Sequence, residues 1–174
     1  MTPAQRDDIL EGAKKAFFEA MMDGWVGEGN RRSIKTKDDD GYVTITYETE
    51  DGKYKVVDRY CTTLSDRSGG TTTIFFRTSL IWIAVWWMAY GGHYPESTIP
   101  FLKHALKENY EGRVFNGGRG PAYFPFPPCQ EERLYTNHFY GDFTSFRGEE
   151  SINSFKPNEV GRIGFHKYFG MSFL

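Results

Sequence analysis

The sequence predicts an α+β fold made of two related halves, each an amphipathic helix followed by a short, mainly antiparallel sheet. Three observations support this prediction. Apolar residues recur at helical spacing near the start, alternating strands flank the tight turn Asp51-Gly52, and a similar order of elements returns later in the chain. A chain of 174 residues can bury one good-sized core. We therefore expect one compact domain over residues 1–174, with halves at about 1–95 and 96–174.

The first half begins with an amphipathic helix over residues about 4 to 22, which ends at Asp23-Gly24. After a glycine-rich stretch, the run YVTITYE alternates as a strand should, and KYKVVDRY follows the hairpin turn as its partner. The β-branched and aromatic residues from Thr71 to Phe76 and from Leu80 to Tyr90 predict two further strands. The half closes at Gly91-Gly92.

The second half also begins with an amphipathic helix, for which Ser97 or Thr98 is the expected N-cap. This helix ends near Glu111-Gly112, and a proline-rich segment over residues 123–128 follows. We expect its prolines to prevent regular ladder pairing. The tail from Arg133 to Leu174 is typical of short strands separated by glycines.

The two halves can be aligned by sliding the chain 79 positions without a gap. Asp58 then meets Asn137, and Gly69 meets Gly148, although few positions are identical. Each half runs in the order helix, loop with glycine and arginine, then strands. We therefore expect residues 54–94 and 133–173 to superpose with the same strand order, as two pseudo-equivalent units packed together.

Composition and charge limit the classes of function. The formal net charge is -2 and the pI is near 6.1, so a DNA-binding role based on a general positive field is not expected. Cys61 and Cys129 form no C-x-x-C pair, and the N-terminus has no apolar signal segment. The longest apolar run, Leu80 to Tyr90, is about half of the ~20 residues that a membrane span requires. These features predict a cytoplasmic protein without a membrane segment.

No cofactor and no metal site are expected, because the four histidines have no chelating spacing and lie apart from both cysteines. No G-x-S-x-G elbow or activated cysteine motif supports nucleophilic catalysis either. The sequence leaves the oligomeric state open, with a homo-oligomer among the alternatives.

Two loops that combine glycine and arginine are the best candidates for a binding site, Gly27 to Arg32 and Gly117 to Arg119. Glycines expose backbone N–H groups and let a phosphate approach, while arginine can bind it with two hydrogen bonds. The alternative for each loop is a simple turn. Aromatic residues beside the loops could stack on a planar group. The ligand-binding residues we expect are Trp25, Arg31, Arg32, Arg119, Tyr123, Phe146 and Glu149.

Among these residues, Arg119 carries the sharpest expectation. Replacing it with alanine should weaken binding of an anionic ligand without changing the melting temperature of the free protein. Of the adjacent Glu149 and Glu150, only one can face a pocket, because neighbouring residues on a strand point to opposite faces. Glu149 is the candidate acid or base, and the alternative is an exposed glutamate or one paired with an arginine.

Several motifs together resemble an uncharacterised bacterial domain family, which occurs alone and also fused behind Cro/C1-type helix-turn-helix regulators. They are AKKAFF, FLKHAL, GRGP and GDFTSFRGEESI. The resemblance covers nearly the whole chain and implies a sensory or ligand-binding role, with no established catalytic residues. The first half departs from the family pattern, because Arg67-Ser68-Gly69-Gly70-Thr71 stands where the family favours F-x-G-x-E.

Three functional hypotheses remain. The leading one is a non-catalytic protein that binds or sequesters a small phosphate-bearing, nucleotide-like signalling molecule, such as a phage protein that counters bacterial defence. The second is a nucleotide hydrolase or lyase that uses Glu149 and a histidine as acid and base. The third is a regulatory module that contacts another protein through its aromatic surface.

Overall fold

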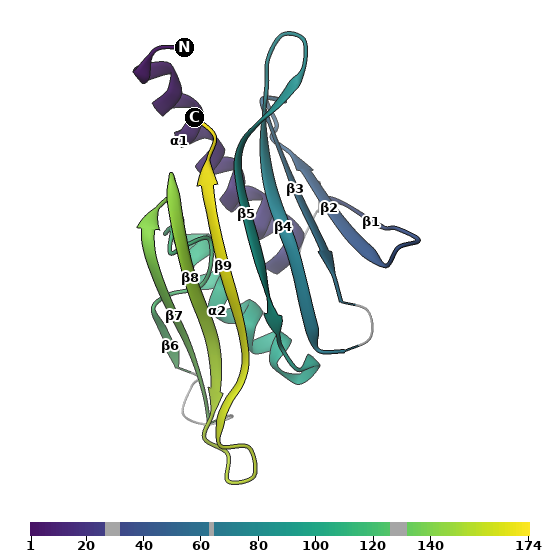
Figure 1. The fold of residues 1–174 in the computed structure, drawn as a ribbon, viewed down its shortest axis with the longest axis vertical. Helices are drawn as coiled ribbons and strands as arrows, with labels where there is room; N and C mark the ends of the chain where they lie inside the picture. Colours follow the sequence, from purple (N-terminus) through teal and green to yellow (C-terminus); the bar gives the residue numbers. More distant parts are fainter. Residues whose placement is uncertain (27–31, 63–64, 126–131) are drawn as a thin grey trace.

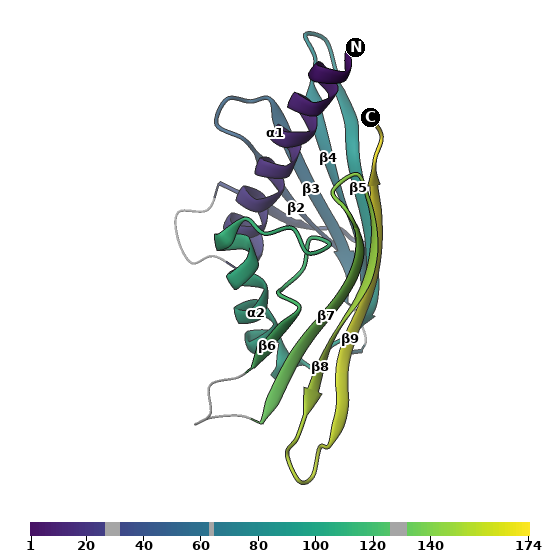
Figure 2. The same cartoon turned by 90° about the vertical axis from the view of Figure 1, so that its left-hand side faces the viewer.

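Two α-helices cover one face of a single antiparallel sheet of nine strands in the part of the chain that the structure describes (Figures 1 and 2). The structure is a computed structural model, and it describes residues 1–26, 32–62, 65–125 and 132–174. The strand order is β1-β2-β3-β4-β5-β9-β8-β7-β6. Strands β5 and β9 therefore pair at the centre, and each is the last strand of its half of the chain.

The helical segments are α1 (Pro3–Met21), a π-helical turn η1 (Met22–Val26), a 3-10 turn η2 (Glu96–Thr98) and α2 (Ile99–Gly112). The first five strands are β1 (Ile34–Lys37), β2 (Tyr42–Glu48), β3 (Tyr54–Cys61), β4 (Arg67–Arg77) and β5 (Trp82–His93). The remaining strands are β6 (Tyr123–Pro125), β7 (Arg133–Asp142), β8 (Ser145–Ser154) and β9 (Gly161–Ser172).

Helix α1 begins where the sequence predicts, because Thr2 and Gln5 form a capping box and Pro3 occupies the first turn. Its buried face is made of small and aromatic residues, including Ala13, Ala16 and Phe17. The helix then widens into the π-helical turn η1, which the sequence did not indicate. This turn carries Trp25 toward the sheet, where its indole donates a hydrogen bond to Asp58 on β3.

Helix α2 starts after Thr98, in agreement with the expected N-cap position. The Thr98 side chain makes no cap hydrogen bond to α2 and donates instead to the carbonyl of Pro95 at 2.7 Å. The helix ends at Gly112, and the left-handed residue that stops it is Arg113, with φ of 52°. The chain then turns back so that Arg119 reaches the space between the helices and the sheet.

The sheet has one buried face and one open face, because residues alternate along each strand. The inward side chains form the core together with α1 and α2, and Trp86 lies at its centre with no exposed surface. The Trp86 ring stacks on Phe143 and Phe146 from the second half of the chain. Among the described residues, no helix lies on the opposite face of the sheet (Figure 2).

Two expectations need correction. The prediction of α+β structure with antiparallel strands is confirmed, but the molecule is mostly sheet, and the strands of both halves form one continuous sheet through the β5–β9 ladder. The proline-rich segment was expected to stay unpaired, yet Tyr123–Pro125 pairs with β7 as the edge strand β6. An edge position tolerates proline because one side of the strand needs no donor. None of the described helices is long and apolar enough to cross a membrane.

Candidate functional site

A pocket of about 340 Å³ lies between the helical layer and the sheet, and we call it the interlayer pocket. This volume is in the range of small-molecule sites. It opens near the end of β3, the start of β4 and the start of α2. Its lining residues are Trp25, Tyr60, Thr62, Ser65, Asp66, Ser68, Tyr90, Tyr94, Glu96, Ile99, Leu102, Arg119 and His166.

A buried ion pair forms the floor of this pocket. Arg119 donates from Nη2 to Glu150 Oε1, and the exposed fractions of the two residues are 8% and 0%. Tyr135 donates its hydroxyl proton to the other carboxylate oxygen at 2.6 Å. The pKa of Glu150 lies below its usual value, because the charge of Arg119 and these hydrogen bonds outweigh burial. Glu150 is therefore a carboxylate whose charge is already balanced.

His166 on β9 stands beside this pair. Its Nε2 shares a hydrogen bond with Ser68 Oγ at 2.8 Å, and its Nδ1 lies 3.7 Å from Glu150 Oε1. Burial, followed by the positive charge of Arg119, lowers the pKa of His166 to about 4. The imidazole is therefore neutral at pH 7.

A second buried carboxyl group, Asp58 on β3, lies beneath the rim of the pocket. It accepts hydrogen bonds from Trp25 Nε1 at 2.8 Å, Thr72 Oγ1 at 2.7 Å and Tyr90 Oη at 3.0 Å. Burial raises its pKa in spite of these three donors. The Arg119 guanidinium lies 5.7 Å from the centre of the Tyr90 ring, so the Tyr90 side chain lies between the two buried carboxyl groups.

Three polar atoms of the pocket residues are buried and have no hydrogen-bond partner among the described residues. They are Tyr94 Oη, Arg119 Nε and His166 Nδ1. The first two are donors, and the imidazole nitrogen donates or accepts according to its tautomer. The Tyr94 hydroxyl makes no hydrogen bond of normal geometry, although it lies close enough to the Glu150 carboxylate for burial and that charge to raise its pKa. Buried polar groups are nearly always paired, so an unpaired set around one pocket indicates a partner that enters it. The chemistry of the set suits a ligand with acceptor oxygens.

The structure brings two of the expected ligand-binding residues together in this pocket, Trp25 and Arg119. Arg32 lies elsewhere, in a groove between α1 and the β2–β3 hairpin, where it pairs with Glu50 at 3.8 Å. Arg31 lies outside the described residues, as does most of the first glycine-and-arginine loop.

The other three expected residues are separate from the interlayer pocket. Tyr123 is 61% exposed on the edge strand β6. Phe146 is a core residue in the Trp86 stack. Glu149 faces away from the helices and pairs with Arg162 and Lys167 on the open side of the sheet.

Sequence reasoning missed Asp58, Tyr90, Tyr94 and His166. The alternation of faces along a strand could have identified Asp58 and His166. Each lies two positions from a buried apolar residue on the same strand, so its side chain points to the same face of the sheet. Val56 and Tyr168 are those neighbours, and all four residues are buried. A charged or polar residue at such a position must have a partner, and this marks it as a candidate for a site.

The described residues contain no group of three or more His, Cys, Asp or Glu side chains placed to hold a metal ion. Comparisons with protein-family models, curated proteins and solved structures gave no match to this chain.

Proposed function

We propose that this chain binds a small molecule in the interlayer pocket and holds it without chemical change. The observation that carries the proposal is the set of three buried, unpartnered polar atoms around one cavity, on Tyr94, Arg119 and His166. Leaving a buried donor without a partner costs about 1–3 kcal/mol. A ligand that satisfies these groups recovers that free energy on binding.

The ligand class follows from the lining. The rings of Trp25 and Tyr60 contact each other, with centroids 5.4 Å apart, and form an aromatic wall of the pocket on which a flat ring system could pack. Arg119 Nε and Tyr94 Oη suit acceptor oxygens of a carbonyl, carboxylate or phosphate. Asp66 and Glu96 also line the pocket and oppose a large negative charge. We propose a nucleotide-like molecule with at most one phosphate.

The biological role we favour is sequestration of such a signalling molecule in the cytoplasm, as in a phage protein that counters bacterial defence. The hydrolase or lyase alternative required Glu149, which lies on the open face of the sheet and pairs with two cations. Glu150 in the pocket is held as a carboxylate by Arg119, and this makes it a poor proton donor.

We further propose that the two halves are related, with a pseudo-twofold axis between β5 and β9. Tyr90 and Tyr168 face each other across this ladder. Tyr90 bonds to Asp58 on β3, and Tyr168 bonds at 2.5 Å to Asn137, which occupies the matching position on β7. A Cβ on Gly70 would meet the Tyr90 hydroxyl, and one on Gly148 would meet that of Tyr168. Gly148 therefore matches Gly70 and not Gly69, so the alignment without a gap is off by one position in these strands.

This relation explains why we propose a single pocket. The strand registers match Ser68 to Phe146, because each lies opposite a glycine of the central pair, Gly92 or Gly170. Ser68 leaves space beside His166, whereas the Phe146 ring fills the corresponding space and stacks on Trp86. The first half therefore keeps a cavity where the second half has core packing.

The test replaces Tyr94 with phenylalanine. Tyr94→Phe removes a buried hydroxyl that makes no hydrogen bond of normal geometry, and Arg119 and Tyr135 still bind the Glu150 carboxylate beside it, so the melting temperature of the free protein should change little. A panel of nucleosides and nucleoside monophosphates is screened by thermal shift, and the best binder is titrated calorimetrically. Its affinity for Tyr94→Phe should be about tenfold lower than for the wild type, which corresponds to one lost hydrogen bond.

The matched control is Tyr110→Phe. The Tyr110 hydroxyl donates to the Gly118 carbonyl at 3.0 Å and does not line the pocket, so this variant should lose about 1 kcal/mol of stability and keep its affinity. Equal affinity for the wild type and Tyr94→Phe would place the ligand elsewhere. Failure of every member of the panel to raise the melting temperature would exclude a nucleotide-like ligand.

A further inference from the structure

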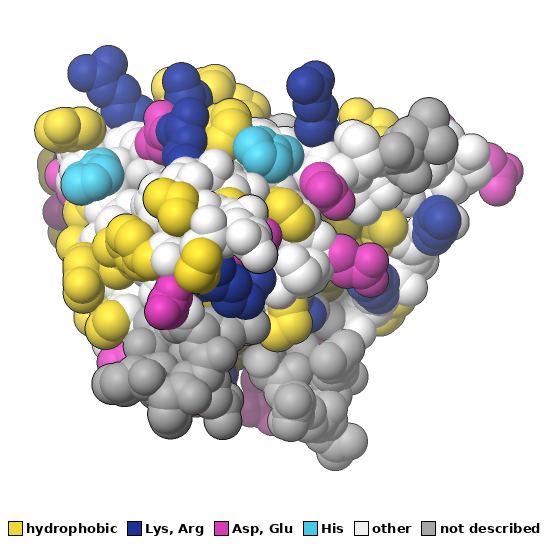
Figure 3. Space-filling model, turned by 90° about the horizontal axis from the view of Figure 1, so that it is seen from below, with side chains coloured by type: hydrophobic (Ala, Val, Ile, Leu, Met, Phe, Trp, Pro, Cys, Tyr) yellow, Lys and Arg dark blue, Asp and Glu magenta, His cyan; other side chains and the backbone are white. Residues whose placement is uncertain are grey.

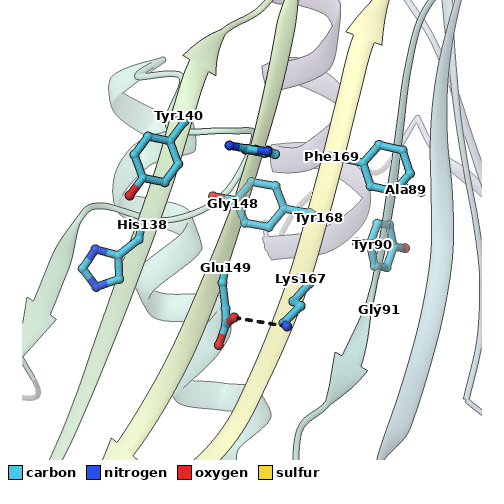
Figure 4. Close-up of a pocket in the computed structure, with 11 residues that line it drawn as sticks. Ala89, Tyr90, Gly91, His138, Tyr140, Gly148, Glu149, Lys167, Tyr168 and Phe169 are labelled. Atoms are coloured by element: carbon cyan, nitrogen blue, oxygen red, sulfur yellow. Dashed lines mark ion pairs between the residues drawn. The ribbon is translucent and has the colours of Figure 1, made fainter.

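The open face of the sheet carries a second feature, a cluster of rings and basic groups that we call the outer cluster. It consists of Tyr140 on β7, Arg147 on β8, and Lys167 and Phe169 on β9 (Figure 4). These side chains border a hollow of about 680 Å³, which is distinct from the interlayer pocket. Two residues, Tyr90 and Tyr168, border it from the inner face.

Strand register sets the geometry of the outer cluster. Arg147 lies opposite Tyr140 on one side and Phe169 on the other, so a cation stands between two rings on three adjacent strands. Tyr140 is 70% exposed and Phe169 is 52% exposed. Neighbouring strands lie about 4.8 Å apart, which separates the two rings by roughly 10 Å.

Arg147 is exposed and forms no ion pair or hydrogen bond with any residue in the described part of the chain. The carboxylate of the neighbouring Glu149 is bound by Arg162 and by Lys167. The positive charge of Arg147 is therefore available to an outside partner.

The floor of the hollow is bare backbone. Gly91 and Ala89 border it, and Gly69 pairs with Gly91 on the next strand. A Cβ added to Gly69 or Gly91 would come no closer than 3.5 Å to another atom, and neither glycine has a positive φ. Neither packing nor conformation requires glycine there. Glycine inside a strand often marks a place where a ligand approaches the backbone closely.

Charge on the open face differs from that of the whole chain, whose formal net charge is -2. Strand register and alternation place more basic than acidic residues on this face. The basic ones on the strands are Lys55, Arg59, Arg67, Arg77, Arg147, Arg162 and Lys167, and the acidic ones are Glu48, Asp142 and Glu149. Asp38 and Asp40, from the turn before β2, pair with Arg59. Figure 3 shows Lys and Arg side chains standing out along one edge of the molecule, with hydrophobic side chains between them.

We propose that the outer cluster binds single-stranded nucleic acid. Bases stack on Tyr140 and Phe169, while Arg147 and Lys167 contact the phosphates between them. Exposed rings on the open face of a sheet, with basic side chains beside them, are the chemistry that single strands require. A duplex keeps its bases stacked on each other, so it cannot use the rings.

The experiment uses the full chain and short, fluorescently labelled oligonucleotides of RNA and DNA, with fluorescence anisotropy measured at two salt concentrations. Phe169→Ala should weaken binding of single strands about tenfold, because one stacked base is lost. Arg147→Ala should weaken binding and reduce the slope of log affinity against log salt by about 0.7, the value for one phosphate contact on a single strand.

Two control variants carry the same chemical changes at other places. Phe155→Ala removes a phenylalanine of similar exposure, 55%, outside the outer cluster. Lys15→Ala removes an exposed cation from α1, on the opposite side of the sheet. Both should bind single strands as the wild type does, and melting temperatures should show that all four variants are folded.

Three results with oligonucleotides would overturn the proposal. They are absence of oligonucleotide binding at low salt, equal affinity of wild type and Phe169→Ala, and duplex binding as tight as that of single strands. Mononucleotides that bind as tightly as oligonucleotides would also overturn it, since they would identify a small-molecule site. The Tyr94→Phe variant should bind oligonucleotides as the wild type does. This proposal and the proposal of a ligand in the interlayer pocket are therefore tested independently.

Discussion

Arg119 shows how burial changes the meaning of a residue that a sequence pattern singles out. The pattern of glycines around it predicted a free guanidinium that reaches a phosphate. In the structure, Arg119 is 8% exposed and its charge is balanced by Glu150, which is wholly buried. Only Nε is left without a partner among the described residues. Arg119 can therefore donate a hydrogen bond from Nε to a ligand, but its positive charge is already neutralised by Glu150.

This pairing reverses the expected effect of Arg119→Ala on the free protein. The substitution leaves the Glu150 carboxylate buried without its cation, so the free energy of unfolding should fall by roughly 3–5 kcal/mol. Urea unfolding of the wild type and the variant measures this change. Adding Glu150→Gln to Arg119→Met should recover part of the loss, because the buried charge is then gone. An unchanged urea midpoint for Arg119→Ala would show that the ion pair does not form.

The choice between Glu149 and Glu150 could have been made from the sequence. Phe146 and Ile152 are apolar and share parity with position 150, so the even positions of this strand were the ones to expect in the core. The structure buries Phe146, Glu150 and Ile152 and leaves Glu149 on the open face. The partner of Glu150 could not be predicted, because Arg119 lies 31 positions away and reaches it only through tertiary folding.

At the scale of elements, the two helices and most strands followed from local patterns, since periodicity and turn residues act over a few positions. The π-helical turn η1 did not, because its benefit comes from a tertiary contact, the Trp25–Asp58 hydrogen bond. The edge strand β6 was missed for a related reason. Proline is compatible with a strand only at an edge, and the sequence does not reveal which strands are edges.

Gly12 in α1 permits close packing of this helix on the sheet. A Cβ at this position would overlap the Tyr54 ring on β3, whose hydroxyl donates to the Ile9 carbonyl at 3.2 Å. Alanine normally favours a helix over glycine by about 1 kcal/mol. Gly12→Ala should nevertheless destabilise the protein by about 1–3 kcal/mol, because the overlap forces the helix or the ring to move.

Gly112 in α2 supplies the matched control for this prediction. A Cβ there would meet Val114 at 3.5 Å, an ordinary contact. Gly112→Ala should therefore stabilise the protein by about 0.5–1 kcal/mol. Urea denaturation compares both variants with the wild type, and equal gains in stability would mean that α1 does not pack on Tyr54 as described.

At the scale of the molecule, the expected halves share one sheet instead of forming two. Strand pairing between distant segments is set by the whole fold, so the β5–β9 ladder could not be read from local patterns. The consequence is a buried polar network across the centre of the sheet. Ser68 from β4 and His166 from β9 meet there at 2.8 Å although they are 98 positions apart, and Arg119 joins them from the loop after α2.

This central network predicts how the stability of the whole molecule depends on pH. His166 has a folded-state pKa of about 4, below its ordinary value of 6.5. Between these values the unfolded chain binds a proton that the folded chain does not. The free energy of unfolding should therefore be fully present above pH 6.5 and fall as the pH drops toward 4. Because each pKa unit is worth about 1.4 kcal/mol, the loss amounts to about 3–4 kcal/mol.

The variant His166→Gln tests whether the titration of His166 causes this loss of stability. Glutamine does not titrate, and its amide can still form a hydrogen bond with Ser68. Chemical denaturation at several pH values between 7 and 4 should show a smaller loss of unfolding free energy for the variant than for the wild type. Glu150 also has a lowered pKa, and the stability that it contributes is lost only as the pH falls below its ordinary value of 4.5. The stability that depends on His166 is lost mainly above this pH, so the two effects can be measured separately. The raised pKa of Asp58 acts with the opposite sign and is common to both proteins. Parallel pH profiles for the two proteins would show that folding does not lower the pKa of His166 and that its surroundings are not those described.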